Sequence, residues 1–522
     1  MTFKLTYASM FNPPADMHSR FDGAMDQVKS GLGATHALFI DGKDVAAASH
    51  DARKSPIDQR MVTGRFPLAT AEDANTAMAA AHAASPAWRK TSVAERVRLL
   101  KKVARLIEER IYLISAALTL EVGKNRMEAL GEVQETADFF DIYADDFARQ
   151  NGFENLLPDD PLPDYRSHNK SVMKPHGVWV VIAPYNFPFA LAGGPVAAAL
   201  VTGNTVVFKS ATDTPWSGRL LADCIRDAGF PPGVFNWLNG SGSVVGEALV
   251  QHPRTAGVTF TGSFEVGMKT YRAMANGRYP RPCIAEMGGK NACIVTAGAD
   301  LERAAAGIIR SAFGLSGQKC SALSRLYVDN AVADQLIAML KDKIAALKVG
   351  DPAQLQNWMG PVTTASALGN YEKFNAQLSQ DGARILVGGK RLTDDERAHG
   401  YFVEPTLAEA PPGHPLFREE MFLPIVMLCR VAGRDQAMQL ANDSPLGLTA
   451  GIYGNDEDVA WFFDNIEAGT TYANRPQGAT TGAWPGYQPF GGWKGSGSTG
   501  KAIASFYYLQ LYLREQSQTT VE

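Results

Sequence analysis

The amino-acid sequence predicts an α/β protein with two domains, each built on a parallel sheet. Apolar runs typical of buried strands alternate with helix-like stretches from about Ser171, beginning with GVWVVIAP and NTVVFK. A second alternating set begins after Pro282 with CIAEMGGKNACIV and ends with ARILVGG, YFVEPTLAEA and PIVMLCRV. Strands that alternate with helices at this spacing indicate βαβ units on parallel sheets. The 522 residues are enough for several domains with sizeable cores.

Helices are predicted before, between and after these strands. Residues 71–89 and 94–122 carry apolar side chains at helical spacing, Gly123 offers a stop, and a third helix is expected over about 127–149. Further helices are expected at 243–250, 264–275 and 331–347. The proline-rich segment 152–169 fits either a linker or a projecting hairpin. The ending YYLQLYLRE alternates like an exposed edge strand, which usually needs a partner strand that a neighbouring subunit could supply.

Composition and charge narrow the class of protein. The net charge of -4 gives no reason to expect nucleic acid or an anionic membrane as partner. The five cysteines are scattered, with no metal-ligand spacing and no sign of a disulfide framework, so a reducing, cytoplasmic location and no metal are expected. Prolines and glycines interrupt the apolar stretch 178–201, which we interpret as a strand, a loop and a helix rather than a membrane span.

Three side chains occupy positions where chemistry is plausible. Cys320 lies in the polar loop GQKCSALSR, where a thiolate could attack a carbonyl carbon once its pKa is lowered or a base assists. Glu286, before two glycines, could activate water, and Asn186 in PYNFP could donate to an oxyanion. Each also has a structural interpretation: a small buried thiol, a solvated strand end, or a turn-forming asparagine. The other four cysteines lie in apolar patterns and are expected in the core: Cys224, Cys283, Cys293 and Cys429.

A turn in GVTFTGSFEVG offers a weak phosphate-site signal. Gly262 and Ser263 separate a strand from a helix, whose first N–H groups could meet a phosphate, and Gly267 permits close packing. The spacing is not that of the usual dinucleotide fingerprint, and turns need glycine anyway.

The ordered set of motifs is far more specific than any one of them. PYNFP, FKSATDTP, FTGSFEVG, EMGGK, GQKC, EEMFLP and PFGGWKGSG follow one another along the chain. Over nearly its whole length the sequence resembles the aldehyde dehydrogenase superfamily. The resemblance implies two Rossmann-like domains and a small β oligomerisation flap. It places the dinucleotide-binding domain at 1–151 and 174–283, the catalytic domain at 284–487, and the oligomerisation segment at 152–173 and 500–522.

The resemblance also implies roles for individual residues. Cys320 matches the nucleophile, Asn186 with the Cys320 backbone N–H matches the oxyanion hole, and Glu286 matches the general base for hydrolysis. NAD is the implied cofactor, and NADP stays open because Thr212 replaces a glutamate that many members carry. Leu423 stands where glycine is commoner. The implied cofactor-binding residues are Lys209, Gly246, Gly262, Ser263, Gly267, Glu420 and Phe422.

Within the superfamily the sequence is similar to the 1-pyrroline-5-carboxylate dehydrogenases, around the base, the nucleophile, TTGAWPGYQPFGGWKGSG and the C-terminal segment. This likeness implies L-glutamate γ-semialdehyde as substrate. Trp484 and Pro485 replace smaller residues, and IAS at 503–505 stands where glycines are usual, so the pocket could suit another aldehyde. Glu135 could face the substrate ammonium or be a solvated helix residue. The implied substrate-binding residues are Ser321, Gly482, Ala483, Phe187 and Glu135.

Other functions are weighed against this one. A dehydrogenase for another semialdehyde, an aliphatic aldehyde or an aromatic aldehyde is the first alternative. A CoA-acylating enzyme would not need Glu286, and a cysteine hydrolase or transferase would want a histidine partner that no motif supplies. An intact set of Asn186, Glu286 and Cys320 speaks against a purely structural role. The expected partners are a small aldehyde and further copies of the chain, as a homodimer or higher oligomer.

Overall fold

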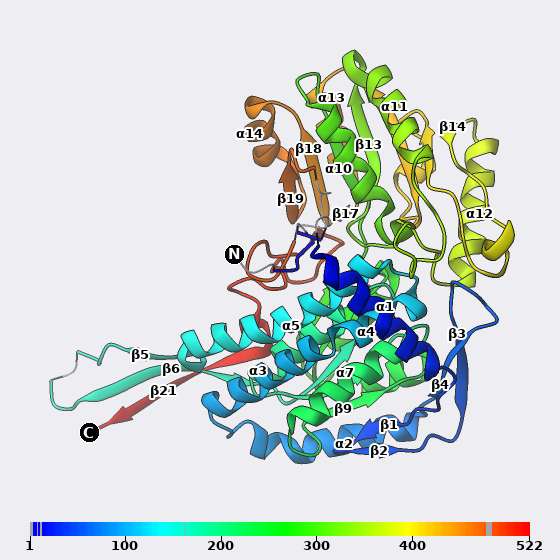
Figure 1. Cartoon of the computed structure of the whole chain (residues 1–522). Helices are drawn as coiled ribbons and strands as arrows, with labels where there is room; N and C mark the ends of the chain where they lie inside the picture. The colour runs from blue at the N-terminus through cyan, green and yellow to red at the C-terminus, as the bar shows by residue number, and fades with distance from the viewer. Residues whose placement is uncertain (1–3, 8, 11–12, 162, 477–482) are drawn as a thin grey trace.

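The computed structural model describes residues 4–7, 9–10, 13–161, 163–476 and 483–522. Figure 1 shows two α/β lobes, with a narrow sheet that projects from the lower lobe. Each lobe contains a seven-stranded sheet in which most neighbouring strands are parallel. The α/β fold with two mainly parallel sheets, predicted from the sequence, is confirmed.

The first sheet has the strand order β11-β10-β7-β8-β9-β1-β2. Strands β7 to β11 are parallel, while β1 pairs antiparallel with both β9 and β2. Helices cover these central strands, so they read as unbroken apolar runs such as WVV at 179–181, which is wholly buried. The strands are β1 (Leu38–Ile40), β2 (Lys43–Val45), β7 (Val178–Ile182), β8 (Thr205–Lys209), β9 (Phe235–Leu238), β10 (Thr255–Thr261) and β11 (Cys283–Glu286).

The helices of this lobe follow the predicted periodicity with one interruption. The expected helix 94–122 is two helices, because Arg110 leaves helical geometry (φ -102°, ψ 9°) and its guanidinium pairs with Asp227. Gly123 ends the second of them in the left-handed conformation, as a C-terminal glycine often does. The helices are α1 (Ala15–Ser30), α2 (Ala71–Trp88), α3 (Val93–Glu109), α4 (Ile111–Val122), α5 (Arg126–Arg149), α6 (Ala190–Val201), α7 (Pro215–Ala228), α8 (Glu247–Gln251) and α9 (Phe264–Ala275).

The second sheet has the order β14-β15-β16-β13-β12-β18-β19, and only β14 is antiparallel to its neighbour. Its strands are β12 (Asn291–Val295), β13 (Leu323–Asp329), β14 (Arg384–Val387), β15 (Thr406–Glu409), β16 (Ile425–Val431), β18 (Thr449–Tyr453) and β19 (Thr470–Ala473). Its helices are α10 (Leu301–Phe313), α11 (Asn330–Ala345), α12 (Ala365–Gln380), α13 (Arg434–Asn442) and α14 (Asp456–Asn465).

The chain passes between the lobes at the EMGGKN motif. β11 pairs with β10 over its whole length, Cys283 to Glu286, and so belongs to the first sheet. The predicted division after residue 283 would cut this strand, so we propose that the division lies after Glu286. Two short strands, β17 (Leu446–Gly447) and β20 (Trp493–Lys494), return a C-terminal segment to the second lobe.

The projecting sheet joins two segments that are far apart in sequence (Figure 1). It has the order β21-β6-β5, with β5 (Glu154–Leu157), β6 (Ser167–Pro175) and β21 (Leu513–Val521) all antiparallel. Segment 152–169 is therefore part of a hairpin rather than a linker. A separate hairpin, β3 (His50–Lys54) with β4 (Val62–Pro67), lies on the first lobe.

The prediction that YYLQLYLRE is an exposed strand was wrong over its first half. Leu509–Tyr512 form a 3₁₀ turn, and the strand begins only at Leu513. Tyr508 and Tyr512 are wholly buried, and their hydroxyls are satisfied because they bond to each other and that of Tyr512 also bonds to the Thr259 hydroxyl. These two tyrosines, four residues apart, fill the core beneath β7, where the centroid of the Tyr512 ring lies 4.6 Å from that of Trp179.

Burial elsewhere matches the sequence pattern. Stretch 178–201 forms β7, a loop and α6, and none of the helices in the described part of the chain is long and apolar enough to cross a membrane. The core positions predicted for four of the cysteines are confirmed, since each is buried: Cys224, Cys283, Cys293 and Cys429.

Candidate active site

Cys320 lies in a loop that close backbone contacts fix in place. The loop follows a 3₁₀ turn (Gly314–Gly317), and the Cys320 carbonyl accepts a hydrogen bond of 2.7 Å from Asn291 Nδ2. A Cβ on Gly289 would lie 2.4 Å from that carbonyl oxygen, so glycine is needed there. A Cβ on Gly317, which has φ +68°, would meet the Leu423 carbonyl at 2.3 Å. These glycines let two motifs, EMGGK and EEMFLP, pack directly against the Cys320 loop.

The Asn186 side chain is held beside this loop. It is buried, and its Nδ2 donates to the carbonyl oxygen of Gln318 at 2.8 Å. Gln318 is itself fixed, since its Oε1 accepts from Thr363 N at 2.9 Å. The amide that the sequence suggested as an oxyanion donor therefore lies next to the loop of the nucleophile candidate.

The Cys320 thiol is in a weakly polar environment. Burial and, to a smaller extent, the carboxyls of Glu420 and Glu286 raise its pKa to about 12, against backbone N–H groups of Ser321 and Cys320 that lower it. The thiol is therefore protonated at neutral pH in this state. The sequence left open whether the pKa of the thiol is lowered or a base removes its proton. This environment favours removal of the proton by a base.

In the described part of the chain, the Glu286 carboxyl makes no contact that would explain it as a structural residue. It ends β11, where its carbonyl accepts from Gly262 N at 3.1 Å. Its Oε2 is buried and has no hydrogen-bond partner among the described residues, and burial raises the pKa of Glu286 well above its usual range. A carboxyl with a buried, unpaired oxygen and a raised pKa, close to a nucleophile, is a strong base once it is ionised and can then accept a proton during a reaction.

A cavity of about 360 Å³ lies on the first lobe, where β8, α8 and α9 meet. Lys209 and Gly246 line it, and burial lowers the pKa of Lys209 to about 8. Gly262 and Ser263 make the turn into α9 without lining the cavity, and Ser263 Oγ caps that helix. A Cβ on Gly267 would lie 2.5 Å from Met287 Sδ, which confirms the close packing expected there. A cavity with a buried lysine at the end of parallel strands fits a dinucleotide.

Glu420 lies against the two glycines of EMGGK, of which Gly289 also borders the Cys320 loop. Glu420 Oε1 accepts from Gly289 N at 2.8 Å, and a Cβ on Gly288 would lie 1.9 Å from its Oε2. Phe422 has φ +56° and stands edge-on to Tyr185, with 5.9 Å between ring centroids. The glycine pair of EMGGK thus makes room for Glu420 as well as for Cys320.

A narrow pocket of about 60 Å³ opens beside Cys320. Four residues predicted to bind substrate line it, namely Glu135, Phe187, Ser321 and Ala483; Gly482 lies outside the described residues. The interpretation of Glu135 as a solvated helix residue is wrong. Its Oε2 accepts from Tyr7 Oη at 2.7 Å, and burial raises its pKa to about 8.

Comparison with known proteins agrees with this geometry. The family model "Aldehyde dehydrogenase family" matches residues 46–517. The chain belongs to the aldehyde dehydrogenase family. It is therefore an NAD(P)-dependent enzyme of that family.

Three relatives are similar to this chain over almost its whole length. A 1-pyrroline-5-carboxylate dehydrogenase of Geobacillus thermodenitrificans is 37% identical over 508 residues, which are 96% of each protein. A 1-pyrroline-5-carboxylate dehydrogenase from Thermus with bound NAD is 34% identical, with a TM-score of 0.91 over 98% of this chain and 97% of that one. A betaine aldehyde dehydrogenase of Staphylococcus aureus in complex with NAD⁺ is 29% identical, with a TM-score of 0.88 over 96% and 97%.

Several pocket residues were not predicted from the family motifs. Tyr7 comes from the N-terminal segment, where no sequence signal marked it. Trp484 also lines the pocket; its Nε1 donates to Asp138 at 2.7 Å and its ring meets Tyr7 edge-on at 5.0 Å. Pro485, Ile503 and Ala504 line the pocket too, so most of the noted departures from the family pattern lie at its wall. No histidine lies among the described lining residues, which gives a cysteine hydrolase no partner for the thiol.

Proposed function

We propose that this enzyme oxidises L-glutamate γ-semialdehyde, the open form of 1-pyrroline-5-carboxylate, to L-glutamate with NAD(P). The observation that carries the proposal is the pocket beside Cys320, where Glu135, Ser321 and Ala483 offer polar groups within a mainly apolar wall. The names of the relatives at 36–37% identity over almost the whole chain support the same substrate.

The proposed reaction proceeds through a thioester. Cys320 attacks the aldehyde carbon as a thiolate after its proton passes through water to a base, and the new oxyanion accepts hydrogen bonds from Asn186 Nδ2 and the Cys320 backbone N–H. Bound NAD(P) would supply, on its positively charged nicotinamide ring, the acceptor for the hydride that the adduct loses as it collapses to the thioester. Glu286 then takes a proton from water, which attacks the thioester, releases the acid and restores the thiol.

The proposed substrate contacts divide between two charges. The Ser321 hydroxyl and backbone N–H groups at Gly482 and Ala483 hold the α-carboxylate, since such N–H pairs bind anions without an arginine. Glu135 faces the α-ammonium; among the described residues that line the pocket, it is the only one with a carboxyl group. Phe187 lines the path of the aldehyde to Cys320.

The apolar wall favours one second candidate. Trp484, Pro485 and Ile503 replace residues that are smaller in the resembled group, and all three line the pocket. An aliphatic or aromatic aldehyde would bury more apolar surface against them than glutamate semialdehyde does.

Initial rates across four aldehydes decide between the candidates. Glutamate semialdehyde, succinate semialdehyde, an aliphatic and an aromatic aldehyde are each assayed with NAD and with NADP. We expect kcat/KM for glutamate semialdehyde to lead by about a hundredfold, on the order of 3 kcal/mol of discrimination. If an apolar aldehyde leads instead, the contacts proposed for Glu135, Ser321 and Ala483 are withdrawn and the thioester chemistry stands.

The Glu135 carboxyl gives the substrate preference a pH dependence. Its pKa of about 8 in the free enzyme means that it is neutral below this pH and charged above it. Attraction for the substrate ammonium therefore grows as pH rises through 8. We expect the ratio of wild-type to Glu135→Gln kcat/KM for glutamate semialdehyde to rise about tenfold, or 1.4 kcal/mol, between pH 7 and pH 9. The same ratio for an aliphatic aldehyde should stay flat, and a flat ratio for both aldehydes would remove Glu135 from ammonium binding.

We propose that Thr212 allows both cofactors. Its hydroxyl donates to the Gly240 carbonyl at 3.0 Å, so no charge at this position repels a 2′-phosphate. Thr212→Glu should lower kcat/KM for NADP at least about tenfold while that for NAD stays within about threefold, because two anions would then face each other. Thr212→Gln is the uncharged control of the same length. Equal losses in both variants would assign the effect to size rather than charge.

We also propose a homo-oligomer built through the projecting sheet. β21 is an edge strand of nine residues with one side unpaired in the described chain, and such edges are normally covered. Light scattering of the purified enzyme measures the state, and a monomer mass at assay concentration would contradict the proposal.

A further inference from the structure

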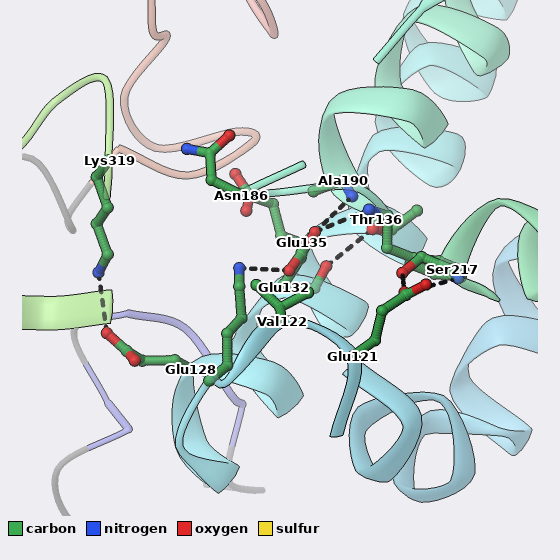
Figure 2. A network of polar contacts seen from close by, with 12 residues as sticks. Glu121, Val122, Glu128, Glu132, Glu135, Thr136, Asn186, Ala190, Ser217 and Lys319 are labelled. Atoms are coloured by element: carbon green, nitrogen blue, oxygen red, sulfur yellow. Dashed lines mark hydrogen bonds and ion pairs between the residues drawn. The ribbon is translucent and has the colours of Figure 1, made fainter. Parts of the chain in front are cut away.

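We propose that two carboxylates one turn apart on α5, Glu128 and Glu132, are positioning residues that hold the Cys320 loop and the Asn186 loop in register. The inference rests on the reactive roles proposed for Cys320 and Asn186. It adds what fixes the relative position of these two groups, which come from different lobes. Figure 2 shows both carboxylates on one helix, Glu128 directed to Lys319 and Glu132 to the start of α6.

Glu132 holds the loop that carries Asn186. Its Oε1 accepts from the backbone N–H of Phe189 at 2.9 Å and of Ala190 at 3.1 Å. These are among the first N–H groups of α6, which have no partner within the helix, and a carboxylate there is favoured by the helix dipole. Asn186 lies three residues before Phe189, so Glu132 fixes the loop from its C-terminal end. The Glu132 side chain is wholly buried.

Lys124 completes this half of the network. Its ammonium forms an ion pair with Glu132 Oε2, and both side chains are fully buried. The same Nζ lies 3.4 Å from the centroid of the Phe187 ring. Lys124 therefore orients the carboxylate and also fixes the aromatic side chain next to Asn186, which lines the substrate pocket.

Glu128 holds the loop that carries Cys320. Its Oε1 lies 3.0 Å from Nζ of Lys319, the residue that precedes Cys320, and both side chains are less than 10% exposed. The hydrogen bond from Asn186 to Gln318 joins this loop to the other one. The contacts thus form a closed circuit from α5 through α6 and Asn186 to the Cys320 loop and back to α5.

Stability alone does not account for this arrangement. Buried ion pairs are often no more stabilising than apolar side chains of the same volume, whereas removal of one partner leaves a costly unpaired charge. The two pairs on α5 end instead on the two loops whose spacing an oxyanion hole requires. A displacement of about 1 Å in such a site can lower the rate about a hundredfold.

A matched pair of variants separates positioning from capping. Glu121 accepts from Trp216 N at 2.6 Å and Ser217 N at 3.0 Å, so it caps α7 as Glu132 caps α6, but α7 carries no residue that lines the Cys320 pocket. Glu132→Gln and Glu121→Gln should both lower Tm, and Glu132→Gln should lower it more because it also leaves buried Lys124 without its carboxylate. Only Glu132→Gln should lower kcat, by about 10- to 100-fold with KM for NAD unchanged. Equal kcat values in the two variants, within about threefold, would overturn the role of Glu132.

A double variant tests the role of the Glu128–Lys319 pair even if the single variants fold poorly. Glu128→Met with Lys319→Met removes both charges and leaves none unpaired, so its Tm should recover toward wild type. If the pair positions Cys320, kcat stays about 10-fold or more below wild type despite that recovery, and Lys319→Arg alone retains activity. If kcat recovers together with Tm, the pair is structural only and the proposal fails.

All rates are measured with whichever aldehyde gives the highest kcat/KM, beside Cys320→Ala. An active Cys320→Ala enzyme would refute the thioester route, whereas an inactive one with unaffected Glu132 and Glu128 variants would refute only the positioning roles.

Discussion

Cys320→Ala abolishes aldehyde-dependent formation of NADH, by at least about 10⁴-fold, if the proposed covalent route is correct. The thiol is the strongest nucleophile among the described residues that line the substrate pocket. The neighbouring Ser321 hydroxyl is a far weaker nucleophile without an adjacent base. Stopped-flow absorbance of NADH and the intact mass of the enzyme after mixing with aldehyde both report the loss, since the alanine variant forms no acyl adduct.

Cys293→Ala is the control for this substitution. Cys293 lies in β12 of the same lobe, is wholly buried, and burial raises its pKa to about 12, as for Cys320. It lines no part of the pocket. The control should keep kcat within about threefold and lose about 1 kcal/mol of stability through the lost sulfur atom. NADH formation by Cys320→Ala at the wild-type rate would refute the covalent route.

Elements with a local signal could be predicted from the sequence. β7, β8 and α9 are marked by apolar runs or helical periodicity within a few residues, and their positions match the prediction. The segment around Tyr508 and Tyr512 was wrongly assigned to an exposed strand. Its apolar pattern indicates that side chains are buried but not against what, and these two tyrosines pack into the core beneath β7 rather than beside another strand. The pairing of β11 with β10, on which we base the proposed division after Glu286, depends on contacts that no local sequence pattern records.

The site shows the same limit. Cys320, Glu286 and Asn186 stand in contiguous motifs and could be proposed from them. Tyr7 contacts Glu135 across 128 residues, and Lys319 contacts Glu128 across 191. Contacts between residues so far apart produce no recognisable spacing pattern in a single sequence. The fold alone brings α5 beside both loops, which is why the positioning residues emerge only from the structure.

Glu286→Gln should give one equivalent of NADH per active site and then stall. The amide cannot take a proton from water, so the thioester forms but hydrolyses slowly, and we expect steady turnover to fall about 10²- to 10⁴-fold. Because Glu286 Oε2 has no hydrogen-bond partner among the described residues, the substitution breaks no contact of that atom and should leave Tm nearly unchanged. Stopped-flow absorbance measures the burst, and intact mass detects the accumulated acyl-enzyme.

Hydroxylamine separates the role of Glu286 in hydrolysis from an earlier one. As an external nucleophile it cleaves a thioester without a general base, so it should restore multiple turnovers to Glu286→Gln. The raised pKa of Glu286 gives it the basicity to accept a proton from water once it is ionised, and also from the thiol of Cys320, whose pKa is about 12. A missing burst, unrescued by hydroxylamine, would therefore move Glu286 to the deprotonation of Cys320, before the thioester. Steady turnover at the wild-type rate would instead require a different base.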